Sequence, residues 1–169
     1  MYDLRIDEPP PLVPRKHRFE VNERIDANGN IIEPITASVM KKIVEAIKQT
    51  DVEACAIGLL FSFLNPNHER QIAKALKANF PKIFISVSSE VQPEFREYER
   101  FSTTVLNAYL QPIVTKYLSN LQDGLAICLP NAKIRINQSS GGVMSVERAC
   151  KYPIRTALSG PAAGVVGAI

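Results

Sequence analysis

The stretch VEACAIGLLFSFLNPNHERQIAKALKANFPKIFISV, residues 52–87, decides the fold class. It begins with a continuous apolar run, which is typical of a strand that is covered on both faces. Asn65 and Pro66 then supply a cap and a first turn for a helix. The inner face of that helix is expected to carry Ile72, Ala73, Leu76 and Phe80. The segment IFISV, residues 83–87, follows as a short buried strand. This order predicts a βαβ unit with parallel strands and a right-handed crossover, and therefore an α/β protein.

The residues that precede this unit predict a hairpin and an amphipathic helix. Strands are expected at about 17–25 and 30–34, because Asn28-Gly29 between them is a strong two-residue hairpin signal. Thr36 is the predicted N-cap of a helix over 37–49, whose apolar residues recur at helical spacing. The proline-rich stretch 9–14 is expected to be an extended connector, and a ligand for an SH3-type domain is a weaker alternative.

A long helix is predicted from Tyr98 to Leu121, where apolar residues follow one another at steps of three or four. Pro112 is expected to kink or split it near residue 111, since proline removes an N–H donor and its ring clashes with the preceding turn. A polar stripe lies opposite the apolar rows and consists of Arg96, Arg100, Thr103, Asn107 and Gln111. Residue physics alone favours a solvated helix start with weak ion pairs over a ligand cleft. Two arginines four residues apart nevertheless repel each other unless an anion or acid lies between them.

The glycine loop QSSGG, residues 138–142, follows a predicted strand at 133–137 and precedes a short helix that Ser145 can cap. The N–H groups of such a loop can bind a carboxylate or a phosphate. A tight strand-to-helix turn also favours glycine, and the composition does not separate the two interpretations. Pro153 is expected to end the short helix, with an extended piece over 154–158.

The last segment, SGPAAGVVGA (159–168), predicts a helix with Ser159 or Gly160 as its cap and Pro161 in its first position. Each glycine inside a helix costs about 1 kcal/mol relative to alanine. A helix that keeps Gly164 and Gly167 therefore usually packs closely against another backbone. We expect a helix wedged between larger elements.

The composition excludes several classes of protein. Hydrophobic residues make up 46% and charged residues 22% of the 169 residues, which is ordinary for a folded domain. The net charge of +3 comes from scattered basic residues, so no nucleic-acid surface is predicted. The apolar runs are too short to span a membrane. P-loop and dinucleotide motifs are absent from the sequence.

The metal-binding and redox-active residue types suggest no site. Cys55, Cys128 and Cys150 are widely spaced and are expected to be reduced thiols of a cytoplasmic protein. His17 and His68 have no cysteine or acid at metal-ligand spacing, so both are expected to be ordinary surface or edge residues. No metal site is predicted.

Several stretches together resemble the hydantoinase A/5-oxoprolinase family. The resemblance is carried, in order, by residues 2–35 and by LLFSFLNPNHER (59–70), SSEVQPEFREYERFSTTVLNAYLQPIV (88–114), QSSGGVMSVERA (138–149) and RTALSGPAAGVVGA (155–168). The family includes ATP-dependent 5-oxoprolinase, the A-type subunit of N-methylhydantoinase and the beta subunit of acetone carboxylase. The resemblance covers nearly the whole chain, and it is specific for the family but not for one member.

The resemblance implies a partial actin-like ATPase fold of the ribonuclease H type. Residues 1–100 would be the end of the family's N-terminal domain, and residues 101–169 the start of its hydantoinase A domain. The family's two glycine-rich phosphate loops, of D-x-G-G-T type, are absent from this sequence. The chain is therefore expected to be an internal fragment that does not bind ATP tightly by itself. In this form its last helix, which resembles a helix that crosses between lobes, should be poorly packed.

The resemblance also implies a function for the longer protein. It would be an ATP-dependent hydrolase of cyclic amides such as 5-oxoproline or hydantoins, with ATP, Mg²⁺ and a hydantoinase B-type partner. The alternative is a non-catalytic piece of a related carboxylase. The catalytic residues are unknown. The residues expected to line the cleft are Arg96, Arg100, Ser102, Asn107, Gln138, Ser139, Gly141, Gly142, Ser159 and Gly160.

Overall fold

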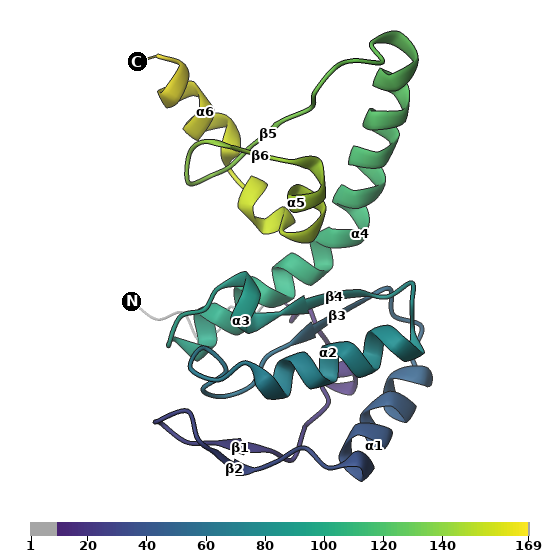
Figure 1. Cartoon of the computed structure of the whole chain (residues 1–169), viewed down its shortest axis with the longest axis vertical. Helices are drawn as coiled ribbons and strands as arrows, with labels where there is room; N and C mark the ends of the chain where they lie inside the picture. Colours follow the sequence, from purple (N-terminus) through teal and green to yellow (C-terminus); the bar gives the residue numbers. More distant parts are fainter. Residues whose placement is uncertain (1–9, 169) are drawn as a thin grey trace, which may run out of the picture.

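The computed structural model describes residues 10–168, except for the side chain of Val166, and places two small units on one long helix, α4 (Figure 1). The elements in chain order are η1 (Arg15–His17), β1 (Arg24–Ile25), β2 (Ile31–Glu33), α1 (Ala37–Lys48), β3 (Ala54–Ile57), α2 (Asn67–Asn79), β4 (Phe84–Val87), α3 (Ser88–Val91), α4 (Glu97–Cys128), β5 (Ile136–Asn137), β6 (Val143–Met144), α5 (Val146–Lys151), η2 (Pro153–Thr156) and α6 (Ser159–Gly167). Among these residues no helix has the length and apolar character that crossing a bilayer requires.

The βαβ unit is confirmed. Strands β3 and β4 pair in parallel, from Ala54 opposite Phe84 to Ile57 opposite Val87. Helix α2 packs on this two-stranded sheet, and the first half of α4 packs against both strands (Figure 1). The core between these elements and α1 is built from Ile43, Ile47, Ile57, Ile72, Leu76, Ile83 and Val87. The predicted α/β class is therefore correct.

The apolar run 52–63 is strand only over Ala54–Ile57, so the longer strand expected there is wrong. The backbone turns after Gly58 because Glu69 of α2 accepts a hydrogen bond from the N–H of Leu59, at 2.9 Å. Phe61 then adopts a left-handed conformation, with φ of 55°. The rest of the run is used in this turn, which leads into α2.

The N-terminal hairpin is confirmed at its turn but is much shorter than predicted. Only Arg24–Ile25 and Ile31–Glu33 are strands, and His17 lies in a 3-10 turn. In the turn, Asp26 Oδ1 accepts hydrogen bonds from the N–H groups of Asn28 and Asn30, both at 2.8 Å. The side-chain amide of Asn30 also donates to Asp26 Oδ2, at 3.0 Å. This side-chain bond contributes most, and the backbone bonds contribute less, to a lowered pKa of the Asp26 carboxyl. Local polar bonds therefore fix the turn, while residues 10–23 form no strand.

Helix α4 runs unbroken through Pro112, so of the two predicted outcomes, a kink or a split, the split does not occur. Figure 1 shows that the helix changes direction part-way along its length, as expected for a helix with an internal proline. The predicted caps of α1 and α5 are confirmed, whereas Pro66, and not Asn65, is the N-cap of α2. Thr36 Oγ1 accepts the N–H of Val39, and Ser145 Oγ accepts the N–H of Arg148, each at 3.3 Å.

The C-terminal unit is built on the second half of α4. Its core consists of Leu118, Met144, Val146 and Ala149. The predicted strand at 133–137 is reduced to Ile136–Asn137, which pairs antiparallel with Val143–Met144. The glycine loop is therefore the turn of a hairpin and not a direct strand-to-helix turn. Residues 153–156 form a 3-10 helix, which corrects the extended piece expected over 154–158.

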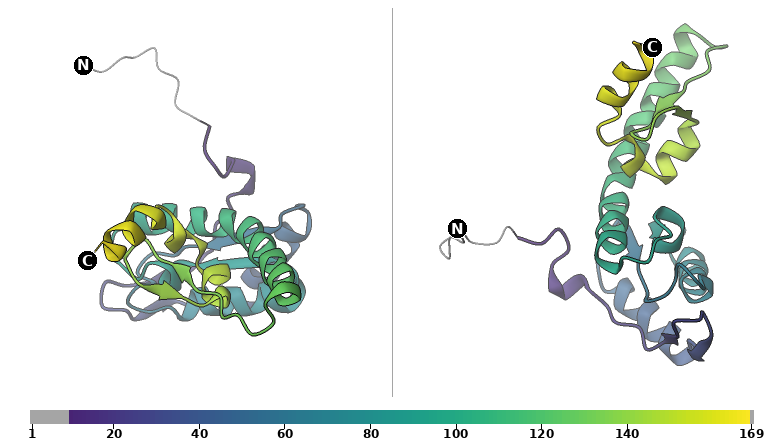
Figure 2. Two further views of the ribbon diagram at one scale, coloured as in Figure 1. Left: turned by 90° about the horizontal axis from the view of Figure 1, so that it is seen from above. Right: turned by 90° about the vertical axis from the view of Figure 1, so that its left-hand side faces the viewer.

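Helix α6 begins at Ser159, two residues before the predicted first position at Pro161, because Leu158 is its cap and adopts a left-handed conformation with φ of 57°. A Cβ atom added at Gly160, Gly164 or Gly167 would meet no atom within 4 Å. The close packing expected from these glycines is therefore absent from the described residues. The exposure of Leu158 and Val165, 83% and 65%, agrees with the poor packing expected for this helix in the 169-residue chain, and α6 lies at the outside of the C-terminal unit (Figure 2).

Candidate functional site

Helix α4 turns its polar side chains inward. Arg100, Thr104, Asn107 and Gln111 are all buried, and they follow one another at helical spacing. Most of the predicted polar stripe thus lies inside the molecule and not on a solvated face. Two members of the predicted stripe differ. The side chain of Arg96 is exposed and lies 3.5 Å from Glu99, and Thr103 is only half-buried, so that Thr104 and not Thr103 is the buried threonine.

Arg100 is completely buried, and each of its three guanidinium nitrogens donates a hydrogen bond. Its Nη2 donates to the carbonyl oxygen of Leu59 at 2.9 Å, and its Nε donates to Ser88 Oγ at 3.2 Å. Its Nη1 donates to the carbonyl oxygen of Glu94. The guanidinium also lies 5.3 Å from the ring of Phe63 and 5.0 Å from the ring of Phe101. Within the described residues Arg100 therefore holds together the loop after β3, helix α3 and the start of α4.

Glu69 is the acid beside this arginine, and no pattern in the sequence indicates that it is buried. Its Oε1 accepts hydrogen bonds from the N–H of Leu59 at 2.9 Å and from the hydroxyl of Ser88 at 2.6 Å. Its Oε2 accepts the N–H of Ser89 at 2.9 Å. Ser88 Oγ thus lies between the carboxylate and the guanidinium of Arg100. A buried acid that satisfies two backbone N–H groups is a structural clamp.

Asn107 and Gln111 form a polar seam between the two units. Ser86 Oγ accepts from Asn107 Nδ2 at 2.9 Å and donates to Gln111 Oε1 at 3.0 Å. Both amides also donate to the carbonyl oxygen of Lys151, at 3.1 Å from Asn107 and 3.0 Å from Gln111. This oxygen belongs to the last residue of α5, where helical carbonyl groups lack partners within the helix. The seam therefore caps α5 from the side of α4.

Helix η2 carries the seam on to the glycine hairpin. The N–H of Ile154 donates to Asn107 Oδ1 at 3.3 Å. The next carbonyl along η2, that of Arg155, accepts from the N–H of Ser139 at 2.8 Å and from its hydroxyl at 3.1 Å. Asn107 and Ser139 come from distant parts of the sequence, and η2 brings them into one hydrogen-bonded chain.

The glycine hairpin uses much of its own hydrogen-bonding capacity. The N–H of Gly141 donates to the carbonyl oxygen of Gln138 at 3.1 Å, and the N–H of Gln138 donates to the carbonyl oxygen of Gly142 at 3.0 Å. Gly141 and Gly142 have φ of 87° and 75°, which only glycine adopts readily. The turn is thus a satisfied hairpin, and together with the N–H of Ser139 at least three of its donors are not free for a ligand.

The other predicted site residues lie in two places. Ser102 is half-buried on α4 near Arg100, whereas Ser159 and Gly160 form the first turn of α6. Helix α6 contacts β5, the strand that leads into the glycine hairpin. The structure thus places α6 beside the strand that precedes the hairpin residues Gln138, Ser139, Gly141 and Gly142, and it leaves Arg96 exposed on the first unit.

Cations surround Tyr152, at the corner between α5 and η2. The guanidinium of Arg155 lies 5.0 Å, and the ammonium of Lys151 5.2 Å, from the centre of its ring. Lys151 Nζ also lies 2.8 Å from Glu90 Oε2, and this hydrogen bond raises the pKa of the lysine. Because Glu90 lies in α3, this contact adds an ion pair beside the polar seam.

His68 corrects an expectation, because it is neither a surface nor an edge residue. Its side chain is buried, and its Nδ1 lies 2.6 Å from Oε2 of Glu23, which is also buried. The pair fastens the segment before β1 to the start of α2. Sequence spacing could not show it, since the two residues lie 45 positions apart.

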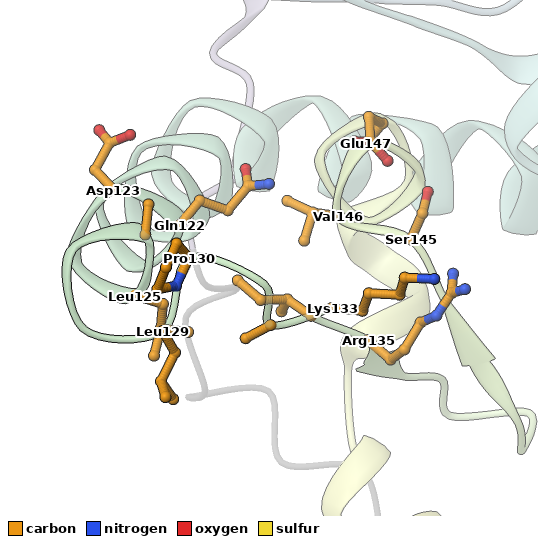
Figure 3. Close-up of a pocket in the computed structure, with 13 residues that line it drawn as sticks. Gln122, Asp123, Leu125, Leu129, Pro130, Lys133, Arg135, Ser145, Val146 and Glu147 are labelled. Atoms are coloured by element: carbon orange, nitrogen blue, oxygen red, sulfur yellow. The ribbon is translucent and has the colours of Figure 1, made fainter.

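An open pocket of about 560 Å³ lies at the far end of α4. Figure 3 shows Lys133 and Arg135 on one side of its opening and Ser145 and Glu147 above them. The hydrogen bond with Ser145 and, more weakly, the charge of Arg135 lower the pKa of Glu147. None of the cleft residues expected from the sequence lines this pocket. Within residues 10–168 no group of three or more His, Cys, Asp and Glu side chains is placed to hold a metal.

Comparison with known families identifies the chain. The family model described as "Hydantoinase/oxoprolinase N-terminal region" matches residues 1–80, and that described as "Hydantoinase/oxoprolinase" matches residues 100–169. The chain belongs to the hydantoinase/oxoprolinase family. The resemblance noted in the sequence is thereby confirmed, whereas a domain boundary at residue 100 stays a prediction.

Three relatives of the hydantoinase/oxoprolinase family show how the chain relates to longer proteins. An uncharacterized protein of Methanocaldococcus jannaschii is 45% identical over 98% of this chain and 24% of its own length. The alpha subunit of the Pseudomonas jessenii caprolactamase is 32% identical over 97% of this chain and 24% of its own length. The 5-oxoprolinase of Saccharomyces cerevisiae is 32% identical over 81% of this chain and 10% of its own length. The chain thus spans about a quarter, or less, of the length of these relatives.

Two solved structures of the family share the fold. The ATP-dependent caprolactamase from Pseudomonas jessenii matches 86% of this chain and 21% of its own, with a TM-score of 0.78 and 33% identity. A nucleotide-free acetone carboxylase structure matches 96% of this chain and 23% of its own, with a TM-score of 0.81 and 29% identity. These matches support the predicted partial actin-like ATPase fold.

Proposed function

We propose that this chain is a segment of an ATP-dependent hydrolase that acts on cyclic amides, with 5-oxoproline or a hydantoin as substrate. The observation that carries the proposal is the match to both family models together with the fold match to an ATP-dependent caprolactamase. Caprolactam and 5-oxoproline are both lactams, so two of the named relatives share a substrate class. In the proposed reaction the γ-phosphoryl group of ATP would pass to the lactam oxygen and ADP would leave. Water would then attack the lactam carbonyl carbon, the ring C–N bond would break, and phosphate would leave to give the ring-opened amino acid.

Within this proposal the seam on α4 positions the site. Arg100 and Asn107 hold the loop after β3 and the α5–η2 corner, and Asn107 is linked to the glycine hairpin through η2. The remaining proposed cleft residues are Arg96, Ser102, Gln138, Ser139, Gly141, Gly142, Ser159 and Gly160. Backbone donors at the start of α6 would stabilise negative charge that develops during the transfer, and the bonded hairpin would hold its place beside them.

ATP and Mg²⁺ belong to the longer polypeptide in this proposal. The described residues bring together no carboxylate group suited to a metal, so they do not fit a Mg²⁺ site of their own. The sequence has no D-x-G-G-T loop, and the hairpin donors at Gln138, Ser139 and Gly141 are already bonded. We therefore propose that the 169 residues alone do not bind ATP tightly.

The relatives that are named as subunits favour a larger assembly. One is the alpha subunit of caprolactamase and another is the beta subunit of acetone carboxylase, and we propose a hydantoinase B-type partner in the cytoplasm. A second candidate function is a subunit of a carboxylase. The acetone carboxylase structure favours it, because it matches a larger share of the chain than caprolactamase does.

The two candidates differ in what stimulates ATP consumption. The test uses a polypeptide of the relatives' full length that carries residues 1–169, together with its partner subunit. Phosphate release is followed with 5-oxoproline, hydantoin or caprolactam, and separately with acetone plus bicarbonate. The proposal expects stimulation by at least one cyclic amide, with appearance of the ring-opened acid. Stimulation only by the ketone and bicarbonate would overturn it in favour of the carboxylase.

A further inference from the structure

Between Tyr98 and Tyr117 the two faces of helix α4 are placed the opposite way from those of an ordinary amphipathic surface helix. The buried face is polar and carries Arg100, Thr104, Asn107 and Gln111. The opposite face is apolar and exposed. It consists of Tyr98, Leu106, Tyr109, Ile113 and Tyr117, which are 82%, 44%, 54%, 57% and 64% exposed. We call these five residues the outer face of α4.

The outer face is long. Its members follow one another at steps of three, four or eight residues, so they share one side of the helix, which also carries the exposed Lys116. At the rise of an α-helix they extend over about 30 Å. Single exposed apolar residues are normal on protein surfaces, but five large ones on one side of a helix are typical of an interaction site. Tyrosine is also enriched in interface cores.

The length of the family's polypeptides indicates what covers this face. The chain accounts for 24% of the Methanocaldococcus jannaschii relative and 21% of the caprolactamase structure. More than three quarters of such a polypeptide therefore lies outside the matched region. The polar face of α4 already contacts both units of the present chain. The outer face is therefore left for a further part of the polypeptide.

We propose that the outer face of α4 is an intramolecular docking surface, covered in the longer polypeptide by a part of the same chain that lies outside these residues. It then resembles the core-facing stripe of any amphipathic helix, while the polar face forms the joint between the two units. The proposal rests on family membership and not on the substrate. It places α4 in the interior of the full protein, between the βαβ unit and a further domain.

Tyrosine nitration tests the proposal directly. Tetranitromethane is added to the 169-residue chain and to a polypeptide of the relatives' full length that carries it, and the nitrated peptides are measured by mass spectrometry. We expect Tyr98, Tyr109 and Tyr117 to react readily in the short chain and roughly tenfold more slowly in the long one. Tyr152, half-buried at the α5–η2 corner, is the internal reference and should react equally in both.

A matched pair of substitutions provides a second readout. Ile113→Lys should lower the Tm of the long polypeptide and leave that of the short chain unchanged. Ser119→Lys, at an exposed position of α4 outside the outer face, should change neither. Equal nitration in the two polypeptides would overturn the proposal. A second result would also overturn it: protection of these tyrosines in the short chain that increases with protein concentration, together with a dimer mass in light scattering. The outer face would then be covered by a second copy of the chain. Neither result depends on ATP or on a cyclic amide.

Discussion

The side-chain amide of Asn107 donates a hydrogen bond to the carbonyl oxygen of Lys151, 3.1 Å away and 44 residues later in the chain. This contact joins the helix that supports the βαβ unit to the end of α5. Because Asn107 also binds Ser86 and Ile154, one buried amide connects β4, α5 and η2. The two units are therefore joined by the continuous helix α4 and by polar bonds such as these, whereas their apolar cores are separate.

Replacing Asn107 by alanine should lower the free energy of unfolding by about 1–3 kcal/mol, since it leaves a buried hydroxyl, carbonyl and N–H group without this partner. Urea denaturation followed by circular dichroism measures the change. Asn120→Ala is the control, because Asn120 is exposed on the same helix and should cost less than about 0.5 kcal/mol. Equal urea midpoints for the two variants would contradict the role of Asn107 in joining β4, α5 and η2.

Arg100→Met and Arg96→Met form a second matched pair on α4. Arg100 is completely buried and donates to two backbone carbonyl groups, whereas Arg96 has an exposed side chain. Removing a buried charge whose partners stay behind costs about 3–5 kcal/mol, and losing an exposed ion pair costs roughly 0–1 kcal/mol. Thermal unfolding should therefore show a large drop in Tm for the first variant alone. Similar Tm values would mean that Arg100 is not the structural residue described here.

The three cysteines should differ in reactivity. Burial raises the pKa of the Cys55 thiol to about 11, so it stays a protonated, unreactive thiol at neutral pH. Cys128 is exposed and should react first with a thiol reagent at pH 8, and the Cys128→Ser variant should lose this fast phase. Rapid modification of Cys55 in the folded protein would contradict the packing of β3.

The raised pKa of Cys55 also makes the stability of the folded protein depend on pH in the alkaline range. The folded protein holds the Cys55 proton more tightly than the unfolded chain, whose thiol has the ordinary pKa of 9.0. The resulting stabilisation is complete below pH 9 and is lost as the pH rises towards 11. Urea midpoints measured from pH 8 to pH 11 should fall more steeply for the natural chain than for Cys55→Ala. Parallel curves would show that the thiol is not linked to folding.

Gly164→Ala should strengthen α6 in the 169-residue chain, because alanine favours a helix by about 0.5–1 kcal/mol and a Cβ at this position meets no neighbour. Hydrogen exchange at the amides of α6 should be fast in the natural chain and slower in the variant. Slow exchange in the natural chain would show that α6 is packed after all.

Local signals in the sequence predicted the elements well. The apolar run, the Asn65-Pro66 helix start, Thr36, Ser145 and Asn28-Gly29 all act within a few residues, and the structure shows the elements and turns they indicate. The strand lengths were overestimated because long-range bonds end them, as Glu69 does after β3. Such bonds depend on the tertiary fold and leave no trace in periodicity.

The orientation of α4 was the feature that sequence reasoning could not provide. Periodicity shows that a helix has two faces, but not which one is buried when part of a protein is considered. For the polar stripe at Arg100, Asn107 and Gln111 the sequence leaves two interpretations, a solvated face or a ligand cleft. In the structure these three residues are buried, and Asn107 and Gln111 lie between the two units. Glu69 and His68 were missed for a related reason, since their partners lie 10 or more residues away.

We propose that this chain carries a joint of a hydantoinase/oxoprolinase protein but not the loops that bind phosphate. The decisive experiment is isothermal titration calorimetry of the 169-residue chain with ATP and Mg²⁺. We predict no saturable heat in the micromolar range. Saturable micromolar binding that is weakened by substitution of Ser139 or Ser159 would contradict the proposal, because the glycine hairpin and the start of α6 would then form a phosphate site by themselves.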